Sequence, residues 1–138
     1  MAQLDKIHNA VKNALINDGW TITADPFEIR FKDIRVYADL AAERPFTAER
    51  NGEKIVVEAK SFVGRSSVSE FEKALGQYNL YLSFLEETSP EYKLFLAISD
   101  KIKNKFFNKI AIRYVIKRFA LRLIVIDLEK EEIVEWIN

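Results

Sequence analysis

The 138-residue chain has no cysteine, one histidine, three prolines and four glycines. Without cysteine, neither a disulfide framework nor a thiolate zinc site can form. With His8 as the single histidine, a metal site needs mainly oxygen ligands, which favours Mg²⁺, Mn²⁺ or Ca²⁺ over zinc. Net charge is missing as well, since 21 basic residues balance 21 acidic ones, so any affinity for nucleic acid must come from a local patch.

Long apolar runs are also absent from the sequence. No run approaches the roughly 18 residues that a membrane helix needs, and residues 1–15 lack the charged-then-apolar pattern of a signal peptide. We therefore expect a soluble, cytoplasmic protein without a membrane partner. No linker divides the chain, and its length and its 49% content of hydrophobic residues suit one domain over residues 1–138.

The spacing of apolar residues predicts the order of helices and strands. Residues 3–17 have the i, i+3, i+4, i+7 repeat of an amphipathic helix that stops at Asp18-Gly19, and residues 67–86 predict a second helix. A basic, partly helical segment is expected over residues 101–119. Strands are expected at 27–31, 34–37, 43–50, 53–60, 92–99, 121–127 and 132–137. This order predicts an α/β (α+β) fold in which helices flank a mixed β-sheet.

Several details of these elements can be predicted. Asn51-Gly52 indicates a type I′ hairpin turn, because both central residues of that turn need positive φ. The apolar run Ile55–Val57 is typical of a central strand that is covered on both faces. Ser66 or Ser67 could cap the second helix. The residues expected to face the core are Leu4, Ile7, Val11, Ala14 and Leu15 in the first helix, and Val68, Phe71, Leu75, Tyr78, Leu82 and Leu85 in the second.

Glu58 and Lys60 are the charged residues that end this apolar strand. Residues two apart in a strand point to the same face, so the two side chains should stand side by side. The triplet taken alone favours an ion pair at the sheet rim, but a carboxylate beside a lysine could also bind a divalent cation and a phosphate. Asp39, nineteen positions upstream at the end of another strand, is a candidate second ligand or an ordinary turn residue. Glu43 and Glu49 lie between them.

Gln77 and Tyr81 are four residues apart and share a face of the second helix. A strand with an acid, a hairpin, a strand ending in E-x-K and a helix with Q-x-x-x-Y together resemble the RecB-like branch of the PD-(D/E)XK nucleases. The resemblance implies a restriction-endonuclease-like fold in which two acids bind Mg²⁺ or Mn²⁺, a lysine assists the attacking water, and the Gln–Tyr pair holds substrate. It assigns these roles to Asp39 and Glu58, to Lys60, and to Gln77 with Tyr81.

The same resemblance leaves two assignments open. That branch often carries a histidine or an acid on its first helix, where His8 lies, although a histidine on an apolar face is more often a core residue. Ala38 stands where the family has proline before the first acid, and Val36 where it has glycine. Both Asp39 and Glu43 therefore remain candidates for the first metal ligand.

A second resemblance covers nearly the whole chain. Five separate stretches are similar, in order and spacing, to the XisH family: residues 18–23, 36–44, 53–62, 74–78 and 133–138. The resemblance implies participation in programmed, site-specific excision of the fdxN element during heterocyst differentiation. The implied partners are DNA, a separate recombinase and the small factor XisI.

The segment from Lys101 to Arg118 contains seven basic residues and no acidic one, with aromatic residues between them. Such a stretch could follow a DNA backbone, but a solvated helical face with inward aromatics or a surface for a protein partner would have the same pattern. The candidate DNA contacts are Lys101, Lys103, Lys105, Lys109 and Arg113, together with Arg65 in the loop before the second helix.

The sequence therefore supports three hypotheses about function. The first is a metal-dependent nuclease-like domain that cleaves a phosphodiester during DNA excision, with Asp39, Glu58 and Lys60 as its catalytic residues. The second is a non-catalytic accessory factor that binds a recombinase, a partner protein or DNA. The third is a purely protein-binding module, and a homo-oligomer is compatible with all three.

Overall fold

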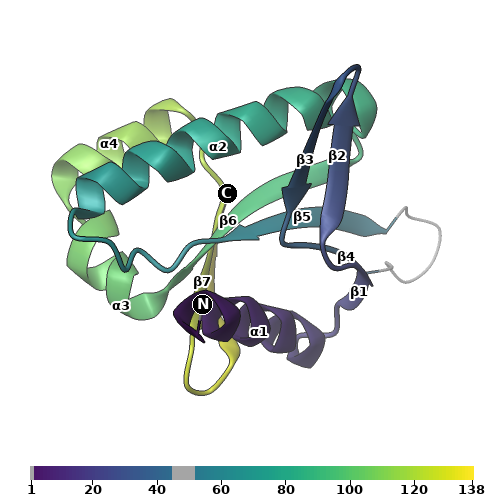
Figure 1. The fold of residues 1–138 in the computed structure, drawn as a ribbon. Coiled ribbons are helices and arrows are strands. Elements are labelled where there is room, and N and C mark those ends of the chain that lie inside the picture. The colour runs from purple at the N-terminus through teal and green to yellow at the C-terminus, as the bar shows by residue number, and fades with distance from the viewer. Residues whose placement is uncertain (1, 45–51) are drawn as a thin grey trace.

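The computed structural model describes residues 2–44 and 52–138, in which helices cover both faces of a mixed six-stranded sheet (Figure 1). β5, β6 and β7 run parallel to one another, and β1, β4 and β8 are antiparallel to their neighbours. In spatial order the strands are β1 (Thr21–Ala24), β4 (Leu40–Arg44), β5 (Glu53–Ala59), β6 (Tyr92–Ser99), β7 (Leu123–Asp127) and β8 (Glu132–Ile137). The expected class, a mixed sheet flanked by helices, is confirmed.

The helices divide between the two faces of the sheet. Figure 1 shows α1 on one side, and α2 with α4 on the other. The helical elements are α1 (Ala2–Asn17), α2 (Ser67–Thr88), α3 (Asp100–Ile102), the π-helical turn η1 (Lys103–Phe107) and α4 (Ile110–Arg118). The hairpin of β2 (Phe27–Phe31) and β3 (Ile34–Ala38) forms a separate two-stranded sheet, and β2 contacts α2. Among these helices, none combines the length and the apolarity that crossing a membrane requires.

The six-stranded sheet separates two apolar cores. Ile55 and Val57 of β5 pack in the core on the α1 side, whereas Val56 packs in the core on the α2 side. This alternation confirms that β5 is a central strand covered on both faces. The predicted face of α1 is buried at Ile7, Val11, Ala14 and Leu15, while the side chain of Leu4 lies outside the described residues.

The buried face of α2 differs from its prediction. Ser66 caps the helix, because its side chain accepts a hydrogen bond from the backbone N–H of Ser69 at 3.2 Å. Val68 was expected in the core but is 57% exposed. The buried residues lie along one face of the helix, and Ala74 and Tyr81 are the two that were not predicted to face the core. The buried residues are Phe71, Ala74, Tyr78, Tyr81 and Leu85. The apolar character of Val68 misled the prediction, since the first turn of α2 lies beyond the core.

One strand begins earlier than predicted. The strand expected at residues 43–50 is β4, which starts at Leu40 and pairs Leu40 with Val57 and Arg44 with Glu53. Pairing with β5 overrides the weak strand propensity of the two alanines after Leu40. Asn51 of the predicted hairpin turn, and Glu49, lie outside the described residues.

Candidate active site

Asp39 and Glu58 hold each other in place at the rim of the sheet. Asp39 is the single residue between β3 and β4, and Glu58 lies near the end of β5. The backbone N–H of Asp39 donates to Glu58 Oε1 at 3.2 Å, and the backbone N–H of Ala59 donates to Asp39 Oδ2 at 2.7 Å. The structure therefore brings together two carboxylates that are nineteen residues apart in the sequence.

Lys60 lies beside this acid pair. Its Nζ is 3.6 Å from Glu58 Oε2, and its backbone N–H donates to the carbonyl of Ala97 on the neighbouring strand at 3.0 Å. The Lys60 side chain is 29% exposed and that of Glu58 only 11%. The lysine can therefore contact Glu58 and solvent from the same position.

The two carboxylates make an environment that favours positive charge. Burial raises the pKa of Glu58, the negative charge of Asp39 raises it further, and Lys60 offsets only part of this, so the pKa is about 8. A carboxylate that is hard to ionise becomes easier to ionise when a cation binds beside it.

The donor set suits a hard divalent cation. Each carboxylate has about four lone-pair sites, and the hydrogen bonds to Asp39 and Glu58 leave some of these free. Among the side chains that the structure describes, those of residues 7–44 and 52–138, no group of three or more histidine or acidic residues is arranged to hold a metal. Two carboxylates without further protein ligands suit Mg²⁺ or Mn²⁺, which keep several waters and bind substrate phosphate, better than a cation that needs a protein cage.

His8 reaches the acid pair from α1. Its Nδ1 is 3.1 Å from Asp39 Oδ1, and its Nε2 is 2.9 Å from Asp25 Oδ1. Lys12 Nζ lies 2.7 Å from Asp25 Oδ2. His8 is 24% exposed and bonded to two carboxylates, so it is not an enclosed core residue. Burial raises the pKa of Asp25, but the hydrogen bonds and charges of Lys12 and His8 outweigh burial and bring that pKa below its usual value.

Asp25 and Lys12 were not identified from the sequence as residues that contact His8 or its partner beside the acid pair. The available signal was the spacing of His8 and Lys12, which are four residues apart and so share a face of α1. Asp25 follows β1, and no local pattern indicates that it lies beside α1.

Gln77 and Tyr81 lie on the side of the acid pair opposite α1. Gln77 Nε2 donates to the Tyr81 hydroxyl at 2.8 Å, and that hydroxyl donates to the carbonyl of Tyr37 at 3.0 Å. Burial raises the pKa of Tyr81, and the nearby charges of Glu58 and Asp39 add to this effect. The hydroxyl therefore stays protonated and anchors the backbone two residues before Asp39.

Glu43 does not join the acid pair. It lies three residues beyond Leu40 along β4, about 10 Å at the usual strand rise. It pairs in register with Lys54, and Lys54 Nζ is 3.5 Å from Glu43 Oε1. Of the two candidates for the first ligand, the structure places Asp39 against Glu58 and Glu43 near the other end of β5.

All of the basic candidates except Arg65 lie in the segment that begins at the sheet edge where the acid pair lies. β6 ends at Ser99 close to the end of β5, since Ala59 pairs with Ala97, and α3 starts directly after it. Lys101 is 84% exposed and 4.0 Å from Glu129. Within the described part of the chain, no ion pair involves the remaining candidates: Lys103, Lys105, Lys109, Arg113 and Arg65. Phe106 and Phe107 are buried, whereas Tyr114 is 64% exposed.

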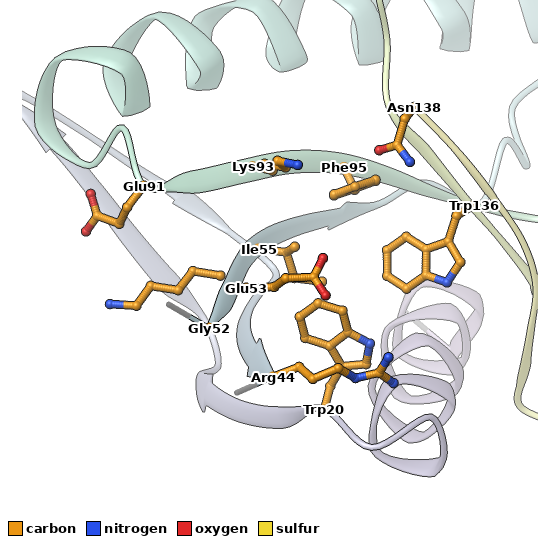
Figure 2. Close-up of a pocket in the computed structure, with 11 residues that line it drawn as sticks. Trp20, Arg44, Gly52, Glu53, Ile55, Glu91, Lys93, Phe95, Trp136 and Asn138 are labelled. Carbon is orange, nitrogen blue, oxygen red and sulfur yellow. The ribbon is translucent and has the colours of Figure 1, made fainter. Parts of the chain in front are cut away.

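A cavity of about 450 Å³ lies elsewhere, beside the start of β5 (Figure 2). Its aromatic wall contains Trp20, Phe95 and Trp136, and the Trp20 and Trp136 ring centroids are 5.7 Å apart. Glu58 and Lys60 are not among its lining residues and lie at the other end of the strand. The acid pair is therefore a site at the sheet rim and does not belong to this cavity.

Comparisons of the sequence and of the structure with known proteins agree on one family. The model of the XisH protein family matches residues 1–134. A crystal structure of an XisH family protein from Nostoc punctiforme PCC 73102 is 38% identical, with a TM-score of 0.88, and the match covers 97% of this chain and 100% of that one. The crystal structure of an fdxN element excision controlling factor protein from Anabaena variabilis is 38% identical, with a TM-score of 0.87 and coverage of 97% and 99%. A comparison with curated proteins gives no match. The chain therefore belongs to the XisH family.

Proposed function

We propose that this chain is a nuclease-like factor of the PD-(D/E)XK type that acts on DNA during programmed excision of a DNA element. The observation that carries the proposal is the interlocked pair Asp39–Glu58 with Lys60 beside it. The excision role is supported by the relative from Anabaena variabilis, which is described as an fdxN element excision controlling factor.

The proposed roles follow from the contacts of each residue. Asp39 and Glu58 would hold Mg²⁺ or Mn²⁺ through the oxygens that their mutual hydrogen bonds leave free. Such a cation, when bound, supplies Lewis-acid polarisation of a phosphodiester and lowers the pKa of water. Lys60, close to Glu58 and partly exposed, would offset the negative charge that develops on the phosphate.

The adjoining basic segment would position the DNA. α3 and η1 start at the edge of the sheet that holds the acid pair, and α4 follows them. Lys101 is 84% exposed and only 4.0 Å from Glu129, and the other candidate cations have no ion pair in the described part of the chain. All of them can therefore neutralise phosphates, which makes binding depend on salt. The proposed contacts are Lys101, Lys103, Lys105, Lys109 and Arg113, with Arg65 on the loop between β5 and α2.

One observation favours an accessory role without cleavage. Ile110 is 86% exposed and Tyr114 is 64% exposed, and both line a shallow groove with Arg113 and Lys117 on α4. Exposed apolar side chains gathered on one surface are typical of a protein interface. In this alternative α4 contacts a recombinase, a small partner such as XisI or a second copy of the chain, and the acid pair contributes no chemistry.

The experiment that separates these functions is a cleavage assay. Purified protein is incubated with single-stranded, duplex and branched DNA and with Mg²⁺ or Mn²⁺. Lys60→Ala is compared with Lys54→Ala, because Lys54 lies on β5, the strand that leads to Lys60, and its Nζ is 3.5 Å from the carboxylate of Glu43. Cleavage that is lost only in Lys60→Ala supports the nuclease-like function. Absence of cleavage with every substrate favours the accessory role, and full activity of Lys60→Ala contradicts the proposed mechanism.

A further inference from the structure

Asp25 links two side chains of α1 to the turn that follows β1. Its Oδ1 is 2.9 Å from His8 Nε2, and its Oδ2 is 2.7 Å from Lys12 Nζ. His8 and Lys12 are four residues apart, so both face Asp25 from the same side of the helix. Each oxygen of the carboxylate therefore has its own partner, and Lys12 limits how far Asp25 can turn away from His8.

The other ring nitrogen of His8 faces the acid pair. Nδ1 is 3.1 Å from Asp39 Oδ1, on the opposite edge of the ring from Asp25. An imidazole is flat and rigid, so the direction of one nitrogen fixes that of the other. The side chains of His8, Asp25 and Asp39 are 24%, 27% and 29% exposed, and water therefore competes only partly for these contacts.

We infer that Asp25 is a positioning residue that, held by Lys12, orients His8 so that Nδ1 braces the Asp39 carboxylate beside Glu58. Carboxylates that bind metals are usually held by hydrogen bonds from outer partners, and loss of such a partner commonly weakens metal binding by about 10- to 100-fold. The effect of Asp25 on cation binding rests on the proposed function, whereas its effect on the ring of His8 does not.

The competing explanation is that Asp25 only fastens α1 to the turn after β1. The chain contains a matched control for this explanation. Asp18 also accepts hydrogen bonds from two side chains, Trp20 Nε1 at 3.2 Å and Arg44 Nη2 at 2.8 Å. It joins the end of α1 to β4, and its side-chain hydrogen bonds go to Trp20 and Arg44 and not to His8 or Asp39. Asp18→Asn therefore removes a comparable link without touching the proposed brace.

The first test is nuclear magnetic resonance of the full chain with labelled histidine. His8 is the only histidine, so its two ring nitrogens give unambiguous signals. Of the two carboxylates that contact the His8 ring, Asp25→Asn changes only the one at Nε2. We nevertheless expect the Nδ1 resonance to shift as well, because the ring turns relative to Asp39. Asp18→Asn should leave both resonances unchanged. An Nδ1 resonance that is the same in wild type and Asp25→Asn overturns the inference.

The second test is the dissociation constant for Mn²⁺, measured by calorimetry on the same proteins. We expect Asp25→Asn to weaken binding by about tenfold and Asp18→Asn to leave it unchanged. Equal weakening in both variants overturns the inference, since loss of stability would then explain it. If Asp25→Asn does not fold, Lys12→Met keeps Asp25 and should give the same effects in weaker form. An Nδ1 shift in a protein that binds no Mn²⁺ supports the role of Asp25 and contradicts the proposed function.

Discussion

Asp39 and Glu58 are joined by two hydrogen bonds between backbone and side chain. The backbone N–H of Asp39 donates to the Glu58 carboxylate, and the backbone N–H of Ala59, the residue after Glu58, donates to the Asp39 carboxylate. This arrangement fixes two like charges at short range in a partly buried position. Like charges placed so close are unfavourable unless a cation or a proton offsets them. The predictions below follow from that relationship and from the contacts around it.

Ionisation of Glu58 should make the free energy of unfolding depend on pH. Its pKa is about 8 in the folded chain against an ordinary value of 4.5, so the folded state holds a proton that the unfolded state releases between these values. The free energy of unfolding should therefore fall as pH rises through this window. Glu58→Gln keeps the shape without the charge and should be more stable than wild type by roughly 1–3 kcal/mol at about pH 9. Denaturant unfolding at several pH values measures this difference, and a difference that does not change with pH contradicts it.

Mn²⁺ should stabilise the wild-type chain through Asp39 and Glu58. A ligand that binds only the folded state raises the melting temperature, and Asp39→Ala and Glu58→Gln should each abolish the rise. Thermal unfolding with and without Mn²⁺ measures it. Glu43→Gln is the control, because Glu43 is paired with Lys54 and away from the acid pair. A rise that persists in Asp39→Ala would place the cation elsewhere.

Tyr81→Phe should weaken Mn²⁺ binding by more than its loss of folding stability explains. The variant loses the hydrogen bond to the Tyr37 carbonyl, at a cost of about 1 kcal/mol, and frees the backbone that leads to Asp39. Tyr78→Phe is a matched control on the same helix, because the Tyr78 hydroxyl donates to the Leu94 carbonyl, and accepts from Arg122 N–H, away from the acids. Both variants should lose stability in denaturant unfolding, but only Tyr81→Phe should bind Mn²⁺ more weakly in calorimetry. Equal Mn²⁺ affinity in the two variants would leave Tyr81 as a structural residue.

Charge reversal on α4 should weaken DNA binding in a salt-dependent way. Each lost phosphate contact lowers the slope of log affinity against log salt by about 1, so Arg113→Glu should reduce both affinity and slope. Fluorescence anisotropy with labelled DNA over a range of salt concentrations provides the measurement. Lys130→Glu, an exposed lysine in the acidic turn between β7 and β8, is the control. Equal effects of the two variants would show that α4 has no specific role.

The sequence predicted elements whose signal is local. Apolar spacing located α1 and α2, and the run from Ile55 to Val57 indicated a central strand. The spacing of Gln77 and Tyr81 correctly placed both on one helix face, where they hydrogen-bond to each other. Side chains alternate between the two faces of a strand, which correctly predicted that Lys60 lies beside Glu58.

The sequence could not predict contacts that depend on how distant segments meet. Asp25 looks like a turn residue, and only the packing of α1 near the end of β1 brings it to His8 and Lys12. The Tyr81 hydroxyl also donates a hydrogen bond to the backbone of β3, and no spacing along α2 reveals this contact. The early start of β4 has the same origin, because its neighbours in the sheet and not its own propensity decide it.

Asp39 is the only residue between a strand of the small hairpin and a strand of the central sheet. One added residue there would reverse which side chains of β4 face α1, since facing alternates at every position. Leu40 and Ala42 now lie in that core, so an insertion would expose both while also moving the carboxylate. The length of this link is therefore a constraint on folding and on the acid pair at once. Homologues should keep a one-residue link at this point even where the hairpin itself varies in length.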